Sequence, residues 1–142
     1  MIDANLNNLK EVFKKDPQIA LGIKDILLLD SKIGRAKIHY EVKKHMCHSK
    51  NIAQGGFVTG WLDASMALAC MAHIGADVLV LSLEIKTSFI SIVSIGDVFA
   101  EGWIVKKGKN IAFLEGTLKD KDNNLLAKGS QTVKLKQDFY KY

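Results

Sequence analysis

The clearest candidate for chemistry is an aspartate inside a segment that is otherwise almost wholly apolar. Asp63 lies within Gly55–Gly75, a stretch rich in alanine and methionine. An isolated carboxylate buried among apolar groups is strongly destabilising, so this residue must be paired, hydrated or functional. Alternatively, it lies on a thin exposed stripe of a helix. The residue type alone leaves both interpretations open.

The position of Asp63 relative to a double glycine favours a function. Gly55 and Gly56 open the segment, and Asp63 follows Gly56 by seven residues. That spacing is about two helical turns, which places the carboxylate on the same face as the helix N-terminus. Free N–H groups at a helix N-terminus attract an anion or a polarised carbonyl oxygen. A carboxylate and an oxyanion-binding helix end are the two parts that acyl transfer needs, although a double glycine can also be a plain turn.

A polar cluster before the double glycine suggests two further kinds of site. His45-Met46-Cys47-His48, helped by His39, could bind a metal, or Cys47 could be a nucleophile with a histidine base. Zinc sites show recognisable ligand pairs, but no second cluster occurs and His73 stands alone. No third orienting group marks Cys47. We therefore favour a polar loop leading into the helix, and expect no metal.

The charge balance is basic, with 20 lysines and arginines against 15 acidic residues and a net charge of +5. Such a balance favours anionic partners in general. Arg35 is the only arginine and the lysines are spread along the chain, so we expect no nucleic-acid partner. Neither a P-loop nor a GxGxxG motif occurs. Around one predicted turn, Lys106, Lys107 and Lys109 could bind phosphates, or they could form a solvated turn.

The elements that must position these residues predict an α+β domain. Apolar spacing indicates an N-terminal helix at about residues 4–16, and Gly55–Gly75 is a long buried helix ending at a glycine. Six runs are typical of strands: Ile23–Leu29, Ile33–Val42, Leu79–Phe89, Asp97–Lys106, Ile111–Lys119 and Leu125–Leu135. In Leu79–Phe89 the alternation places the leucines on one face and Ser82 on the other. One long helix packed on an antiparallel sheet is the expected architecture.

The chain is expected to form a single domain over residues 1–142, with its core at about 20–136. The two cysteines, Cys47 and Cys70, are too few for a disulfide framework, and no signal peptide is apparent. The longest apolar stretch, Ala64–Ala72, is short of the roughly 20 residues of a membrane span. We therefore expect a cytoplasmic protein without a membrane partner.

Several segments together resemble one family. Cys47–Phe57, which ends in Gln54-Gly55-Gly56-Phe57, and the following Trp61-Leu62-Asp63 resemble the central motif of hotdog-fold acyl-CoA thioesterases of the phenylacetate-degradation type. The match is to the Gln-Gly-Gly variant of that family's His-Gly-Gly motif. Ser82–Phe89 and Ala127–Thr132 resemble later landmarks of the same family.

The resemblance implies a hotdog fold that hydrolyses an acyl-CoA thioester to free acid and coenzyme A, without a cofactor. It makes Asp63 the nucleophile or general base, and it makes the backbone of Gly55 and Gly56 the donors that polarise the thioester carbonyl.

The resemblance also assigns roles to three polar side chains. Gln54 stands where other members have histidine. His48 stands where they have an asparagine that positions water or substrate, and Ser82 falls where a serine or threonine assists the site.

An assembled form is expected as well. An apolar edge strand such as Leu79–Phe89 is a liability in a monomer. Proteins that this one resembles pair that strand with its symmetry mate, which implies a homodimer or a dimer of dimers (a homotetramer). Each site would then combine Asp63 of one chain with Gly55 and Gly56 of the other. Two alternatives stay open: a non-catalytic acyl-CoA or lipid-binding protein on the same fold, and a small basic scaffold protein without a site.

Overall fold

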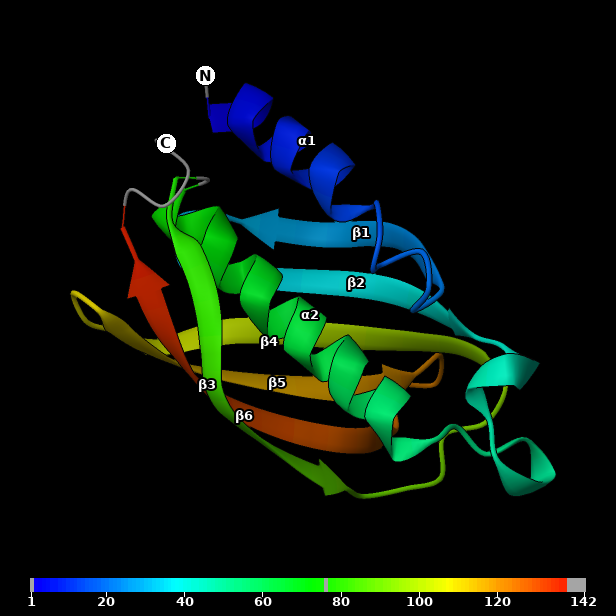
Figure 1. Ribbon diagram of the computed structural model, residues 1–142. Coiled ribbons are helices and arrows are strands. Elements are labelled where there is room, and N and C mark those ends of the chain that lie inside the picture. Colours follow the sequence, from blue (N-terminus) through cyan, green and yellow to red (C-terminus); the bar gives the residue numbers. More distant parts are fainter. Residues whose placement is uncertain (1, 76, 138–142) are drawn as a thin grey trace.

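A long helix, α2 (Gly55–Ile74), lies across a curved antiparallel sheet that wraps around it (Figure 1). The computed structural model describes residues 2–75 and 77–137. In this part of the chain the sheet has six strands in the order β1-β2-β4-β5-β6-β3. They are β1 (Ile23–Asp30), β2 (Arg35–Val42), β3 (Leu79–Phe89), β4 (Gly96–Lys107), β5 (Ile111–Asp120) and β6 (Leu125–Lys136). The predicted α+β hotdog architecture is confirmed.

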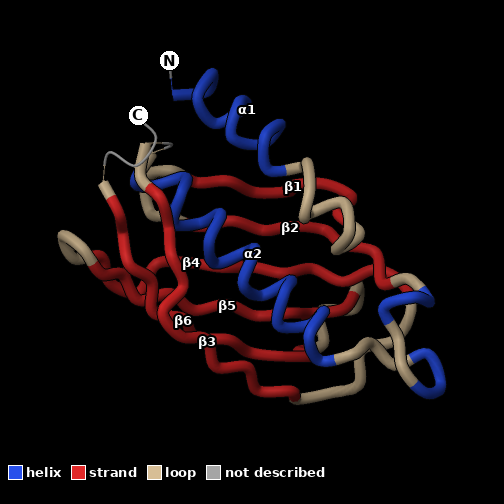
Figure 2. Tube along the Cα trace, in the orientation of Figure 1, coloured by secondary structure: helices blue, strands red, loops and turns tan. Residues whose placement is uncertain are grey.

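The N-terminal helix and the loop before α2 differ from the prediction only in detail. Helix α1 covers Ile2–Phe13 and ends earlier than residue 16, because the backbone ahead of Pro17 disfavours a helical conformation. Figure 2 shows two short helical turns before α2, Lys44–Met46 and Ser49–Asn51. They form the expected loop, which carries the His45–His48 cluster into the start of α2.

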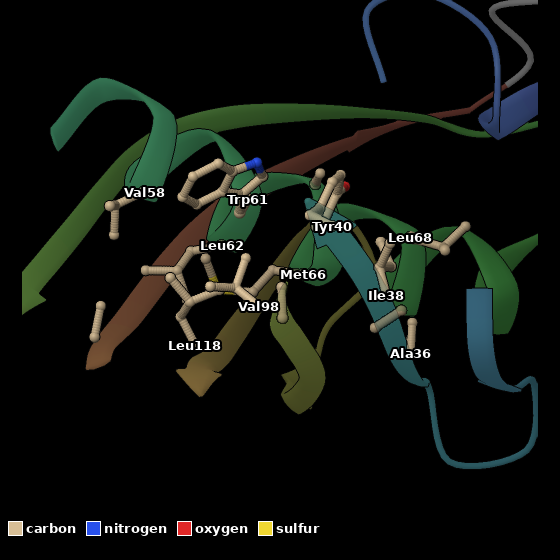
Figure 3. Close-up of a cluster of buried hydrophobic side chains, with 14 of the residues drawn as sticks. Ala36, Ile38, Tyr40, Val58, Trp61, Leu62, Met66, Leu68, Val98 and Leu118 are labelled. Atoms are coloured by element: carbon tan, nitrogen blue, oxygen red, sulfur yellow. The ribbon is translucent and has the colours of Figure 1, made fainter. Parts of the chain in front are cut away.

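The core explains why α2 is so apolar. Trp61, Leu62 and Met66 point from α2 toward strand side chains such as Tyr40 and Leu118, and all five are fully buried (Figure 3). Strand β4 passes directly beneath the helix at Gly102, where an added Cβ would lie 2.5 Å from the Ser65 backbone. Since real Cβ atoms do not approach backbone so closely, a glycine is required at this crossing.

Helix α2 is also the one helix in the described residues that is long and apolar enough to cross a membrane. The expectation drawn from the stretch Ala64–Ala72 is therefore too short, because the whole apolar helix covers 20 residues. The helix meets only the criteria of length and composition. Within its 18-residue apolar stretch, 56% is buried inside the protein. A helix at the centre of a globular core passes the same test.

Strand β3 corrects the predicted alternation. Ser82 pairs with Val133 of β6 and Glu84 pairs with Thr132, so Leu83 is an extra residue in a bulge. Because Val133 is buried, its neighbour Ser82 faces α2. Leu81 therefore points away from the helix and is 39% exposed. The leucines that the sequence assigned to the buried face are not buried in this chain.

Strand β3 lies at one edge of the sheet, as predicted. Its outer edge has no strand partner among the described residues. Leu83 and Phe89 on this strand are more than half exposed, and so are Ile90 and Ile92 just after it. A long apolar edge of this kind favours pairing with another strand.

Candidate active site

Three polar side chains meet where α2, β3 and β6 come together. The Gln131 Nε2 donates hydrogen bonds to Asp63 Oδ1 at 2.5 Å and to Ser82 Oγ at 2.6 Å, and Ser82 Oγ donates to Asp63 Oδ1 at 3.4 Å. We call these residues the carboxylate cluster. Both hydrogen bonds that Asp63 accepts reach Oδ1, and no described residue donates to Oδ2. One carboxylate oxygen is therefore held in place while the other stays free to react.

Asp63 lies on the least buried stripe of α2. The half-buried side chains of Thr59, Asp63, Ala67 and Met71 recur at steps of four, and all the other residues between Trp61 and Cys70 are buried. Asp63 is thus half-buried and paired, neither isolated in the core nor fully exposed, and this position is compatible with a function. The stripe gives the carboxylate access to solvent while its neighbours stay in the core.

The electrostatic environment around this carboxylate includes a buried tyrosine. Burial, together with the negative charge of Asp63, raises the pKa of Tyr40 above its ordinary value. The hydroxyl therefore keeps its proton at neutral pH, and it donates a hydrogen bond to Gln18 Oε1 at 2.6 Å. Tyr40 is a structural hydroxyl rather than a second base.

Gln131 is a residue of the candidate site that the sequence did not point to. It is 3% exposed, and its Oε1 is a buried polar atom without a partner among the described residues. A buried amide normally satisfies both of its ends. One signal could have identified it: in β6 the alternate residues Ala127, Gly129, Gln131 and Val133 are buried, and only the glutamine among them is polar.

The start of α2 presents one free amide. The Gln54 side chain caps the helix, because its Oε1 accepts a hydrogen bond from the Gly56 N–H at 2.8 Å. Gly56 can therefore donate to a ligand only if the Gln54 side chain turns away. No described residue accepts a hydrogen bond from the Gly55 N–H, so Gly55 is the available donor of the two predicted.

A pocket of about 450 Å³ opens beside this amide. Gly55 and His48 both line it, so the structure brings these two predicted residues together. Its other side is the end of β3 and the chain after it, residues 89–93. A Cβ added to Gly55 would lie 3.2 Å from the Phe89 ring. Asp63 does not line this Gly55 pocket.

Within one chain the two halves of the predicted site are therefore apart. Asp63 follows Gly55 by eight residues, which corresponds to about 12 Å along a helix. The carboxylate cluster lies beside Ser82 of β3, whereas Gly55 lies beside Phe89 at the other end of that strand. A single carbonyl group cannot contact both.

The three predicted phosphate-binding lysines lie elsewhere. Lys106, Lys107 and Lys109 are exposed around the β4–β5 turn, near the end of the molecule where α2 terminates (Figure 1). Lys107 is close enough to Cys70 to lower the pKa of its thiol, but burial dominates and raises it to about 11. Cys70 is therefore a neutral core residue at physiological pH.

The histidines of the alternative metal site have other contacts. His39 Nε2 lies 2.7 Å from Asp97 Oδ1, and His48 Nδ1 lies 3.0 Å from Ser49 Oγ. The Cys47 thiol donates to the Lys43 carbonyl at 3.6 Å. Across residues 2–75 and 77–137, no group of three or more histidine, cysteine or acidic side chains is arranged to hold a metal ion.

The fold and the site together define a hotdog protein with a carboxylate on its central helix. Comparison of sequences identifies the family: residues 51–127 match the Thioesterase superfamily, and the chain belongs to it. A protein of Saccharolobus solfataricus named "Putative esterase SSO2140" is 28% identical over 120 residues, which is 84% of each chain.

Solved structures agree on the fold. A mutant of the phenylacetic acid degradation protein PaaI of Thermus thermophilus is 25% identical with a TM-score of 0.73, over 84% of this chain and 98% of that one. The thioesterase HI1161 of Haemophilus influenzae, at 18% identity, has a TM-score of 0.82 over 94% of this chain and 92% of that one. Membership of the superfamily confirms the predicted thioesterase class. The phenylacetate-degradation type and the Gln-Gly-Gly variant remain predictions.

Proposed function

We propose that the protein is an acyl-CoA thioesterase in which Asp63 acts on the thioester carbonyl. The observation that carries the proposal is the carboxylate cluster, which fixes Oδ1 of Asp63 and leaves Oδ2 free. Oδ2 either attacks the carbonyl carbon, forming a mixed anhydride that water then hydrolyses to the free acid and the Asp63 carboxylate, or it takes a proton from a water that attacks the carbonyl carbon and gives the free acid directly. In either route the carbon–sulfur bond breaks, and the thiolate of coenzyme A leaves and is protonated. Superfamily membership supports the hydrolysis of acyl thioesters as the class of reaction.

The Gly55 N–H supplies the second part of the proposed mechanism. At the start of a 20-residue helix it carries positive character, and it would hydrogen bond to the carbonyl oxygen as negative charge develops there. His48, which shares the Gly55 pocket, would position water or substrate. Gln54 keeps the helix start in place through its cap on Gly56.

The order of residues along β3 supports a site shared between two chains. Asp63 contacts Ser82 near the start of the strand, and Gly55 lies next to Phe89 at its end. Suppose that two copies of β3 pair in antiparallel fashion about a two-fold axis between Ile85 and Lys86. Ser82 of one chain is then opposite Phe89 of the other. That pairing would place Asp63 beside Gly55 of the second chain and would cover the exposed edge.

The remaining parts of the proposal concern the substrate and the surroundings. Coenzyme A carries several phosphate charges, and Lys106, Lys107 and Lys109 are the lysines that we propose would attract them. No further cofactor or metal is required for this chemistry. We also propose a cytoplasmic homodimer or dimer of dimers.

A panel of acyl-CoA substrates tests the function directly. We expect the purified chain to release coenzyme A from at least one member of a panel spanning short, aryl and long acyl groups, measured with a thiol-detecting reagent. Release should not change with a chelator present, because the proposed site has no metal. Binding of acyl-CoA without release of thiol would instead indicate the non-catalytic binding protein, and neither binding nor release would contradict both.

The carboxylate cluster makes a separate prediction about Gln131 and Ser82. Gln131→Leu and Ser82→Ala should each lower kcat by about tenfold, because each removes a hydrogen bond to a charged carboxylate. The Gln131 Nε2 group contacts both Asp63 and Ser82, so the two substitutions are not independent. The double variant should therefore lose less kcat than the product of the two single losses.

Steady-state kinetics of the two single variants and the double variant provide the measurement. Thr132→Val is a matched control, since Thr132 adjoins Gln131 but donates to Glu84 on the outer face. Wild-type kcat in Gln131→Leu would contradict the positioning role.

A further inference from the structure

The half-buried stripe of α2 that carries Asp63 continues toward the helix C-terminus as an apolar surface. Ala67 lies one turn beyond Asp63, and Met71 lies one turn beyond Ala67. Neither side chain carries a charge, and both are half-buried. The reactive carboxylate is thus at the start of an apolar track along the helix.

Strand β3 provides a matching track on the other side. Val80 and Ser82 point to the same face of the strand, because they pair with the buried residues Leu135 and Val133 of β6. Both Val78 and Val80 pack partly against the core. As β3 runs antiparallel to α2, these valines follow the same direction from the carboxylate cluster as Ala67 and Met71 do.

Helix α1 closes this track into a groove. Leu6, Leu9 and Val12 of α1 line one cavity together with Ala67, Met71, Val78 and Val80. The cavity has a volume of about 580 Å³, the largest of those described between residues 2 and 137. We call it the α1–α2 groove. Among the described residues that line it, Asp77 is the one charged residue, and Asn5 and Asn8 are the polar ones.

We propose that the α1–α2 groove holds the hydrocarbon tail of a linear fatty acyl group. The inference rests on the proposed thioesterase function of Asp63. A thioester carbonyl at Asp63 has an apolar path beginning one helical turn away, whereas the phosphates of coenzyme A would meet Asp77 and no cation among the described residues of the lining. The groove volume is in the ordinary range for ligand pockets.

The dimensions of the groove point to a medium or long chain rather than an acetyl group. Gly75, at the far end of the lining, follows Asp63 by twelve residues, which is about 18 Å along a helix. An acetyl group would leave this space empty of substrate. Because α1 provides one wall, the N-terminal helix becomes a specificity element of the enzyme.

A series of straight-chain acyl-CoA substrates from two to sixteen carbons tests this inference. Each methylene that enters an apolar groove contributes about 0.8 kcal/mol. We therefore expect kcat/KM to rise about fourfold per added methylene over the first part of the series. The rise should stop once the chain fills the groove.

Two variants show whether the groove causes that rise. Ala67→Phe fills the groove near Asp63, and Val12→Trp fills it from α1, where Val12 is 56% exposed and tolerates a larger side chain. Both should lower the ratio of the twelve-carbon to the four-carbon kcat/KM at least about tenfold. Val105→Trp is the control, because Val105 is 55% exposed and does not line the groove.

The outcomes separate the two proposals. Hydrolysis with a flat chain-length profile, or with a profile that neither variant changes, overturns the acyl groove and leaves the thioesterase function intact. If no acyl-CoA is hydrolysed, the thioesterase function fails. Calorimetric binding of four-, eight- and twelve-carbon carboxylates to the wild-type chain then decides the groove, which is overturned if the affinity does not increase with length.

Discussion

Replacing Asp63 with asparagine is expected to lower kcat for the preferred acyl-CoA by at least about a hundredfold. A neutral amide is neither a nucleophile nor a base, so Oδ2 loses its proposed role. The asparagine side chain would keep an oxygen in the position of Oδ1, where it can still accept from Gln131 and Ser82. The fold and the binding of acyl-CoA should therefore persist, which circular dichroism and calorimetric titration would measure.

Asp97→Asn is the matched control for this change. Asp97 is also a half-exposed carboxylate with a close polar partner, His39, but it lies on β4 away from the carboxylate cluster. This variant should keep wild-type kcat. If Asp63→Asn turned over substrate at the wild-type rate, the proposed mechanism would be wrong even though the protein belongs to the superfamily.

The parts of the fold that follow from local pattern were predictable. Helix α2 begins at the double glycine and ends before Gly75, as its apolar composition and flanking glycines indicate. The hairpins follow from short polar turns between alternating strands. The edge position of β3 also agrees with its apolar sequence.

The face of β3 could not be predicted, because it depends on a partner strand distant in sequence. The bulge at Leu83 exists only in the pairing with β6. A single extra residue reverses which side chains face the helix on one side of it. The same reversal turns Ser82 toward Asp63. The bulge therefore explains both why the leucines are not on the buried face and why Ser82 is on it.

The candidate site illustrates the same division between local and distant information. Asp63 and Gly55 stand out within one segment, whereas Gln131 contributes from a strand 68 residues further along the chain. The capping of Gly56 by Gln54 depends on the rotamer of one side chain. Neither contact can be predicted from the spacing of residues in the sequence. A single polar residue among the buried positions of β6 could, however, have identified Gln131.

The second large effect is expected when two inactive variants are mixed. In a shared site, Asp63→Asn removes the carboxylate of one chain and Gly55→Leu blocks the amide of the other. A Cβ at Gly55 already lies 3.2 Å from Phe89, so a leucine side chain would fill the Gly55 pocket. Each variant alone should be inactive, because both of its two sites are damaged.

Co-refolding equal amounts of the two variants should restore activity. Random pairing makes half of the dimers mixed, and each mixed dimer has one site with an intact Asp63 facing an intact Gly55. The mixture should therefore reach about a quarter of the wild-type kcat per chain, because two-fold symmetry gives each dimer two equivalent sites. Sites contained within one chain predict no recovery at all, since every chain in the mixture carries a damaged residue. Light scattering of the active wild-type protein provides the independent check, and a monomer that still turns over substrate would refute the shared site.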